Sequence, residues 1–320
     1  MKKADATMVA ELKSGRKGAW RRDFAQNKTV YLVFLPVLIY FFVFHYLPMF
    51  GILMSFEDYN VRAGIFGSKW VGWDNFARLF SGGQFGIALK NTVIIGFFNT
   101  LFGFTAPLIF ALLITQVRNK RFRKGIQICT YMPNFVASMV ICTLLTQFLD
   151  SEGAITLLLT KLFGLDPQNW LANAEPPVFW LIYSISGAWQ SFGYGSIIYV
   201  AAICNINSDL YEAGALDGTN RWSAMWNITL PAILPTVIMM LTLQVGTMFK
   251  AGFDRILLLY SPSTYAVADT LFSYTYRMAF GASPDFGLSA ASGLFQSVVG
   301  TLLLFLSNWL NKKTAKSSLF

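Results

Sequence analysis

Between Leu210 and Pro231 the chain reads LYEAGALDGTNRWSAMWNITLP. This stretch lies between two long apolar segments, but it contains the charged residues Glu212, Asp217 and Arg221. A charge near the centre of a lipid bilayer costs several kcal/mol. The stretch therefore predicts an ordered, water-facing connector between two apolar helices.

The connector predicts two short helices joined by a turn. Asp209 and Glu212, three residues apart, resemble a capping box at a helix start. Residues 218–220, Gly-Thr-Asn, supply a turn and a new N-cap. Pro231 suits the first turn of the following helix but not a helix interior. Two helices meeting at an angle would expose small and apolar side chains to a partner, namely Leu210, Ala213, Ala215 and Leu216.

The composition of the chain is that of an integral membrane protein. Hydrophobic residues make up 55% of it and charged residues only 13%, whereas about a quarter of the residues of a soluble domain are charged. The three cysteines and the single His45 lie in apolar segments, and none has metal-ligand spacing. No metal or cofactor is therefore expected on this chain.

We predict an all-α membrane protein with six transmembrane helices. The apolar segments are long enough to cross about 30 Å of hydrocarbon, and they span residues 29–56, 91–117, 126–149, 178–204, 232–249 and 287–310. The connector, residues 206–231, joins the fourth and fifth spans. The transmembrane domain covers residues 29–311, and the tail covers residues 312–320.

Residues 1–28 are expected to form a cytoplasmic basic segment with no cleavable signal peptide. They contain eight Lys or Arg residues. Trp20 and Phe24 are four residues apart and would share one face of a short interfacial helix. The alternative for residues 1–15 is a disordered basic tail.

The distribution of positive charge predicts the orientation. Six spans place both termini on one side, together with the connector and the basic stretch at residues 118–124. That side holds 17 of the 25 Lys and Arg residues, so the positive-inside rule places both termini in the cytoplasm. The net charge of +9 is thus explained by membrane topology, and nucleic acid is not expected as a partner.

Neither of two common devices for driving transport is present in the sequence. No Asp, Glu, Lys or Arg lies within the six predicted spans, although proton-coupled carriers commonly place such residues in the membrane. The chain also lacks the Gly-x-x-x-x-Gly-Lys-Ser/Thr phosphate-binding loop. Coupling to sodium that is coordinated by backbone groups stays open as an alternative. A transporter without any such device needs an external ATPase, and the connector is where one would dock.

The connector resembles the "EAA" loop of permease subunits in bacterial ABC importers. The resemblance rests on the spacing of Glu212-Ala213-Gly214, Gly218 and Ile228-x-Leu230-Pro231. It implies a coupling helix that docks into a groove of an ATPase subunit, with contacts from Glu212, Ala213, Gly214, Asp217, Gly218, Ile228, Leu230 and Pro231. Gly214 departs from the family pattern, which usually has alanine there.

The same resemblance implies the partners of the chain. In this family two permease subunits pair, usually as different chains, and two ATPase subunits bind ATP and Mg below them. An extracytoplasmic binding protein delivers the substrate to the outer loops. The chain itself would not be an enzyme, and it would reside in the bacterial cytoplasmic membrane.

Polar residues within the spans are candidates for a substrate path. The fourth span contains Trp189, Gln190 and Tyr194 beside two glycines, and aromatic rings with amide and hydroxyl groups suit a sugar. Further candidates are Asn134, Gln147 and Gln244. The alternative is that these residues only hold helices together.

Beyond the connector, two stretches resemble the carbohydrate branch of these permeases. They are residues 253–262, FDRILLLYSP, and residues 265–270, YAVADT. That branch includes subunits for oligosaccharides, some of them containing uronic acids. The likeness extends from about Tyr31 to Trp309 and implies an oligosaccharide substrate.

Other functions stay open at this point. The same importer class also carries peptides, amino acids and anions. The spans lack cations for an anion, but Lys250, Arg255 and Arg277 could receive an acidic sugar in an outer vestibule. A membrane enzyme would need a catalytic constellation, and carboxylates such as Asp150 and Glu152 are only scattered. A passive channel would not need the connector.

Overall fold

The computed structural model describes residues 23–24, 26–172, 176–250 and 253–315. These residues fall into two units. The first comprises residues 1–53 and 60–68, and the second comprises residues 54–59 and 69–320. Most of the predicted basic segment at residues 1–28, with Trp20 and its interfacial helix, lies outside the described residues.

The first unit consists mainly of one apolar helical segment. It contains α2 (Lys28–Phe41), the π-helical turn η1 (Phe42–Tyr46) and most of the 3-10 helix η2 (Leu47–Phe56). Residues 28–56 are long and apolar enough to cross a membrane, and no side chain in their most apolar part is buried within the protein. A helix of this kind suits lipid, because its backbone polar groups bond internally.

The second unit contains the other apolar helices. These are α4 (Gly83–Thr115), the continuous segment α10–η4–α11 (Arg221–Ala224, Met225–Thr229 and Leu230–Gly246) and α15 (Phe286–Ala315). Within the described residues, four helical segments can cross a membrane by length and composition, or five if one bent pair counts as a span. The predicted all-α membrane architecture is confirmed at this level.

The fourth predicted span coincides with α8 (Pro176–Cys204). At 1.5 Å per residue, its 29 residues are about 44 Å long, enough to cross a bilayer. This helix is less apolar than the others because it contains Gln190 and several glycines and serines. The count of six spans and the cytoplasmic placement of the termini stay predictions.

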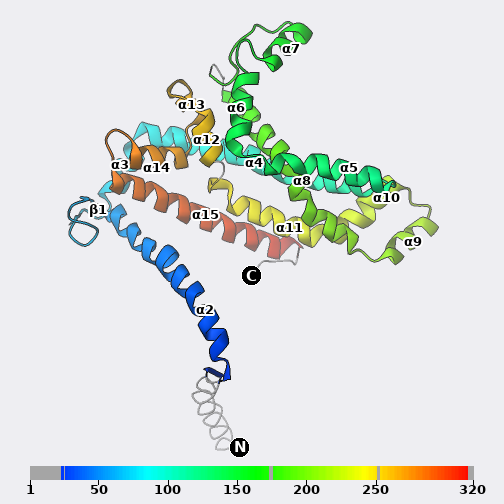
Figure 1. Ribbon diagram of the computed structural model, residues 1–320, viewed down its shortest axis with the longest axis horizontal. Helices are drawn as coiled ribbons and strands as arrows, with labels where there is room; N and C mark the ends of the chain where they lie inside the picture. Colours follow the sequence, from blue (N-terminus) through cyan, green and yellow to red (C-terminus); the bar gives the residue numbers. More distant parts are fainter. Residues whose placement is uncertain (1–22, 25, 173–175, 251–252, 316–320) are drawn as a thin grey trace, which may run out of the picture. The chain divides into compact units, whose positions relative to one another are not determined.

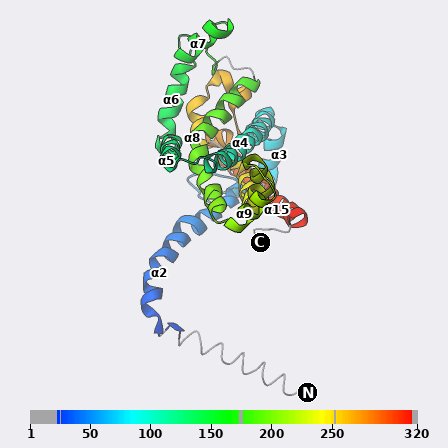
Figure 2. The same cartoon turned by 90° about the vertical axis from the view of Figure 1, so that its right-hand side faces the viewer.

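The third predicted span is not one straight helix. Helix α5 (Lys120–Tyr131) continues into the 3-10 turn η3 (Met132–Phe135), and α6 (Ser138–Phe148) leaves at a bend of 93°. Pro133 lacks a backbone N–H, and residues 136–137 have extended ψ angles of 132° and 137°. In Figure 2, α5 is viewed nearly along its axis while α6 lies across the line of sight.

The basic stretch at residues 118–124, before this span, is largely helical. The Asn119 side chain accepts hydrogen bonds from the N–H groups of Arg121 and Phe122, at 3.0 and 3.2 Å. This N-cap lets α5 begin at Lys120 and places four basic residues in its first turns.

The connections between the long helices also hold short elements. β1 (Glu57–Asp58) pairs with β2 (Lys69–Trp70) in antiparallel register, with Glu57 opposite Trp70, and α3 (Asp74–Ser81) follows. α7 (Ala154–Phe163) lies in the connection before α8. Between α11 and α15 lie η5 (Met248–Lys250), α12 (Phe253–Leu259), η6 (Pro262–Thr264), α13 (Tyr265–Ala268) and α14 (Leu271–Phe280).

Helix α4 contributes to all three hydrophobic clusters of the second unit. Its Ile95 packs with residues of α6, α8 and α12, its Phe85 with residues of α3, α14 and α15, and its Leu112 with residues of α8 and α11. Its most extensive partner is α8, and the two helices run side by side (Figure 1). The other long helices are therefore arranged around this pair.

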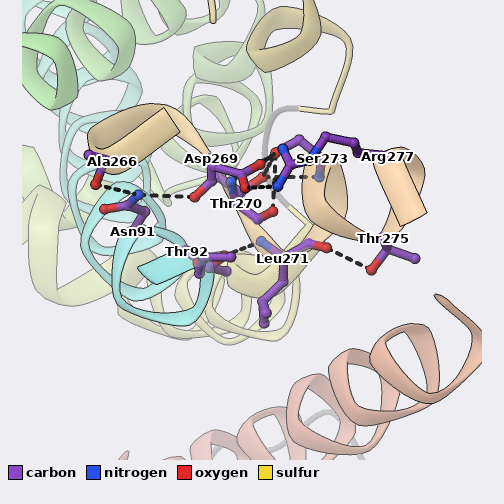
Figure 3. A network of polar contacts seen from close by, with 10 residues as sticks. Asn91, Thr92, Ala266, Asp269, Thr270, Leu271, Ser273, Thr275 and Arg277 are labelled. Atoms are coloured by element: carbon purple, nitrogen blue, oxygen red, sulfur yellow. Dashed lines mark hydrogen bonds and ion pairs between the residues drawn. The ribbon is translucent and has the colours of Figure 1, made fainter. Parts of the chain in front are cut away.

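Two buried polar side chains of α4 hold the segment that contains α13 and α14. Asn91 donates from Nδ2 to the carbonyl oxygens of Ala266 and Asp269, at 3.2 and 3.0 Å (Figure 3). Thr92 accepts from the N–H of Leu271 at 2.7 Å. Since Leu271 is the first residue of α14, Thr92 satisfies a buried N–H that has no partner inside that helix.

The same segment contains an ion pair between partly buried Arg277 and buried Asp269. Arg277 donates from Nη2 to Asp269 at 2.6 Å, and Ser273 donates to the other carboxylate oxygen at 2.7 Å (Figure 3). The Arg277 guanidinium also lies over the ring of Tyr265 at 4.5 Å. Burial opposes its charge, but the hydrogen bond and the charge of Asp269 raise the pKa of Arg277. The positive charge of Arg277 is thus compensated by Asp269 within the fold.

Replacing Thr92 by valine is expected to destabilise the protein by about 2 kcal/mol. The substitution preserves shape but leaves the buried N–H of Leu271 without an acceptor. The midpoint of thermal unfolding in detergent measures the effect. Thr143→Val is the matched control, because the exposed hydroxyl of Thr143 donates to the carbonyl of Met139, one turn earlier in its own helix. Equal midpoints for the two variants would contradict the role assigned to Thr92.

Candidate functional site

The connector contains the two predicted short helices, but the first starts differently from the prediction. Helix α9 (Ser208–Leu216) has Asn207 as its N-cap. The Asn207 side chain accepts from the N–H of Asp209 at 3.1 Å and donates to the Asp209 carboxylate at 3.0 Å. The predicted capping box of Asp209 with Glu212 is therefore wrong, because Asp209 already lies in the first turn. Glu212 is exposed.

The predicted turn is confirmed. Gly218 has a φ of +75°, which a residue with a side chain adopts only at a cost. Its N–H bonds to the carbonyl of Ala215 at 3.1 Å, and the N–H of Thr219 bonds to that of Gly214 at 2.9 Å. This is the Schellman arrangement of a helix end. Asn220 then accepts from the N–H of Ser223 at 2.8 Å and starts α10, as predicted.

Pro231 lies inside a continuous helical segment, although the sequence predicted a helix start there. It is the second residue of α11, but α10, η4 and α11 follow one another without a break. The five residues before α11 form a π-helical turn, in which the N–H of Leu230 bonds to the carbonyl of Met225. The wider turn changes the hydrogen-bond register directly before the proline.

One face of α9 packs against the following helix. Gly214 is buried, and a Cβ at this position would lie 2.7 Å from Cδ1 of Ile228. The hydroxyl groups of Tyr211 and Thr229 are 2.9 Å apart and share a hydrogen bond. Glycine at position 214, where the family pattern has alanine, thus leaves room for Ile228. The two helices of the connector are held together by these contacts.

The other face of the connector is apolar and open. Leu216 is 90% exposed and Trp222 is 62% exposed. Ala213, Ala215 and the charged residues Glu212, Asp217 and Arg221 are exposed as well. We call the exposed apolar side chains the connector patch, and it comprises Leu210, Ala213, Ala215, Leu216, Trp222 and Trp226.

A polar cavity of about 270 Å³ lies among α4, α8, the end of α11 and α12. Its lining is rich in amide and hydroxyl groups, and consists of Asn99, Thr100, Gly103, Tyr183, Ser184, Gly187, Ala188, Ser191, Gln244, Thr247, Met248 and Arg255. A neighbouring cavity of about 210 Å³ shares Gly103, Ser191 and Gln244 with it. We call the first of these the central cavity.

Gln244 is the one predicted path residue that lines the central cavity in the described part of the chain. Trp189 lines an apolar groove between α6 and α8, and Gln190 donates to the backbone carbonyl of Val136 at 3.1 Å. Tyr194 contacts Phe135 edge to face, with ring centroids 6.0 Å apart.

The other two path candidates lie elsewhere. Asn134 lies in the turn η3 at the bend between α5 and α6, and Gln147 is exposed near the end of α6. The assignment of all six residues to a substrate path stays a prediction.

Sequence reasoning missed most of the cavity lining. On α8 a signal existed, because Ser184, Gly187, Ala188 and Ser191 follow the i, i+3, i+4, i+7 spacing of one helix face. Asn99 and Gly103 are likewise one turn apart on α4. The sequence offered Arg255 only as a cation of an outer vestibule, and no local pattern placed it in this cavity, which it enters from a separate short helix.

Comparison with known proteins identifies the class to which this architecture belongs. Residues 103–316 match the family described as "Binding-protein-dependent transport system inner membrane component". The chain belongs to this family. The prediction of a permease subunit is thereby confirmed, and the permease is a transport component rather than an enzyme.

Similar proteins cover nearly the whole permease. It is 35% identical to protein LplB of Bacillus subtilis (strain 168), over 100% of this chain and 98% of that protein. It is 36% identical to the polygalacturonan/rhamnogalacturonan transport system permease protein YteP of the same organism, over 92% and 91% of the two chains. A solved bacterial alginate ABC transporter, in complex with an alginate pentasaccharide-bound periplasmic protein, superposes with a TM-score of 0.84 at 34% identity, over 93% and 99% of the two chains.

Substituting Gly214 by alanine is expected to loosen the connector, because the new methyl group would displace the end of Ile228. The cost should be about 1 kcal/mol, since the displaced atom is the flexible end of a side chain. The measurement is the rate of tryptic cleavage at exposed Arg221 in membranes, which should be higher for Gly214→Ala than for the native permease.

Ile228→Val removes the Cδ1 atom that the new methyl group meets. The double variant Gly214→Ala/Ile228→Val should therefore be cleaved at the rate of Ile228→Val alone. Cleavage of the double variant as fast as Gly214→Ala would contradict the packing described here.

Proposed function

We propose that the permease forms half of the translocation path of an ATP-driven oligosaccharide importer. One observation carries this proposal: the connector patch is exposed between α8 and α11, and both of these helices line the central cavity. An ATPase that binds the patch can therefore act on the cavity through the helices.

The connector patch has the composition of a protein-binding surface. Its six exposed apolar side chains lie within seventeen residues of the chain, and aromatic residues such as Trp222 and Trp226 are enriched at interaction sites. The surrounding charges, Glu212, Asp217 and Arg221, suit an aqueous interface rather than lipid. Five of the eight connector residues that the "EAA" resemblance implies for docking are exposed, namely Glu212, Ala213, Asp217, Gly218 and Pro231. Gly214 and Ile228 instead pack against each other within the connector.

The contacts within the connector provide a route for motion. A shift of α9 acts on α11 through Gly214 against Ile228 and through the bond between Tyr211 and Thr229. Gln244 lies fourteen residues beyond Leu230, about 21 Å along the helix. Closure of the ATPases would thus tilt α11 as a rigid element and change the cavity that Gln244 lines.

The lining of the central cavity supports a sugar as the substrate. Asn99, Thr100, Gln244, Thr247 and Ser191 offer amide and hydroxyl groups that can bond sugar hydroxyls. YteP is named for polygalacturonan and rhamnogalacturonan, and the similar solved structure is an alginate transporter. These names favour an oligosaccharide over a peptide or a small anion.

The proposal includes the partners expected from the sequence. A second, homologous permease would complete the path, and two ATPase subunits would hold ATP and Mg. An extracytoplasmic binding protein would deliver the oligosaccharide. Six spans with both termini inside would place the connector in the cytoplasm, beside the ATPases, and the complex would lie in the bacterial inner membrane.

Introducing a charge into the connector patch tests the coupling. The permease is co-expressed with its second permease and ATPase, and the complex is reconstituted with the binding protein in nanodiscs. Leu216→Asp should lower oligosaccharide-stimulated ATP hydrolysis at least tenfold, because a desolvated carboxylate in an apolar interface is costly. The side chain is 90% exposed, so the fold of the permease should be unaffected.

Leu216→Met keeps an apolar side chain at the same position and serves as the control. It should retain most of the stimulated hydrolysis and of the ATPase bound on co-purification. Native rates for Leu216→Asp would refute the docking role of the connector patch.

A further inference from the structure

The connection between α11 and α15 contains two arginines whose surroundings differ in the structure. Arg277 is held by the carboxylate of Asp269 and lies over Tyr265. Arg255, on α12, lines the central cavity. The ion pairs among the described residues are Arg78 with Asp285 and Arg277 with Asp269, so Arg255 has no carboxylate partner in that part of the chain.

Neutral groups position the Arg255 guanidinium at the cavity. Its Nη2 donates to the hydroxyl of Ser186 at 2.6 Å, and its Cζ lies 5.3 Å from the centre of the Tyr183 ring. Gly187 makes room for it, because a Cβ there would collide with Nη1. The Nε atom is buried and has no hydrogen-bond partner among the described residues. The side chain is thus oriented without a carboxylate among the described residues to neutralise its charge.

A partly buried guanidinium without a counter-charge is unfavourable, since burial removes water that would otherwise solvate the charge. A carboxylate compensates this cost best, because its two oxygens match the fork of the guanidinium N–H groups. The rest of the lining is uncharged, and Asn99, Thr100 and Gln244 face the same cavity with hydrogen-bonding groups. The cavity therefore combines one unneutralised positive charge with groups that can bond hydroxyls.

We propose that the central cavity binds an acidic sugar unit and that Arg255 pairs with its carboxylate. This inference rests on the proposed function, since it names the class of oligosaccharide that the path would carry. Arg255 is then a specificity-determining residue: it favours a uronate over the neutral sugar of the same shape. Arg277 does not share this role because Asp269 neutralises it.

A matched pair of ligands tests the proposal. Trigalacturonate and its fully methyl-esterified form share rings and linkages but differ in charge. Their binding to the complex of both permeases and the ATPases in nanodiscs, without the binding protein, is measured by calorimetry. The native complex should bind the free acid at least tenfold more tightly than the ester.

Variants of Arg255 separate charge pairing from packing. Arg255→Gln should weaken binding of the free acid about tenfold and change binding of the ester less than twofold. Arg255→Lys keeps the charge but not the fork, and should lower the preference for the acid about threefold. Lys161→Gln removes one exposed charge on α7 away from the cavity, and should behave as native.

Equal binding of acid and ester by the native complex would overturn the proposal, as would equal weakening of both ligands by Arg255→Gln. If Arg255→Gln does not fold, Arg255→Lys provides the test. An unchanged preference of that variant for the free acid over the ester would contradict pairing of the carboxylate with the guanidinium N–H groups. The proposed function fails separately: the acid would bind with the expected preference, but ATP hydrolysis with the binding protein would not respond to it.

Discussion

The close packing of α4 along α8 is the interaction on which the rest of the second unit depends. Gly195 of α8 faces Pro107 of α4, where an added Cβ would be in ordinary contact at 3.4 Å, and Gly193 of α8 lies directly against the backbone of Thr130 of α5. Helices in lipid associate through such close contacts, because lipid tails provide no hydrophobic driving force between them. All three hydrophobic clusters contain residues of α4, and α8 contributes to two of them.

Polar side chains are partnered differently in the structural part of the permease and in the cavity that we assign to transport. Around α14, Thr92 bonds to Leu271 and Asp269 pairs with Arg277, although Oδ1 of Asn91 and Nη1 of Arg277 have no hydrogen-bond partner among the described residues. In the central cavity, Gln244 and Arg255 face open volume instead. Unused hydrogen-bonding capacity is costly in a protein interior, and a cavity built to receive a polar ligand is one place where it is retained.

Local chemistry explains which sequence predictions succeeded. Gly218 and Asn220 specify their turn through backbone conformation and a short-range cap, so both were predictable from adjacent residues. The capping box at Asp209 was wrong because Asn207, two residues earlier, competes for the same role. The third span was drawn through Pro133 because hydrophobicity reports burial in lipid and not the direction of a helix. The same pattern is compatible with a straight or a bent segment.

The sequence by itself determined the membrane class, the connector and its turn, and most of the apolar helices, since each follows from composition or from residues within a few positions of one another. Only the tertiary structure decided which polar residues share a cavity. Asn99, Ser191, Gln244 and Arg255 belong to four separate segments. Their proximity follows from how α4, α8 and α11 pack and from where α12 is placed, and no local pattern encodes it. The same holds for the two arginines, since whether a carboxylate lies within reach depends on the folded chain.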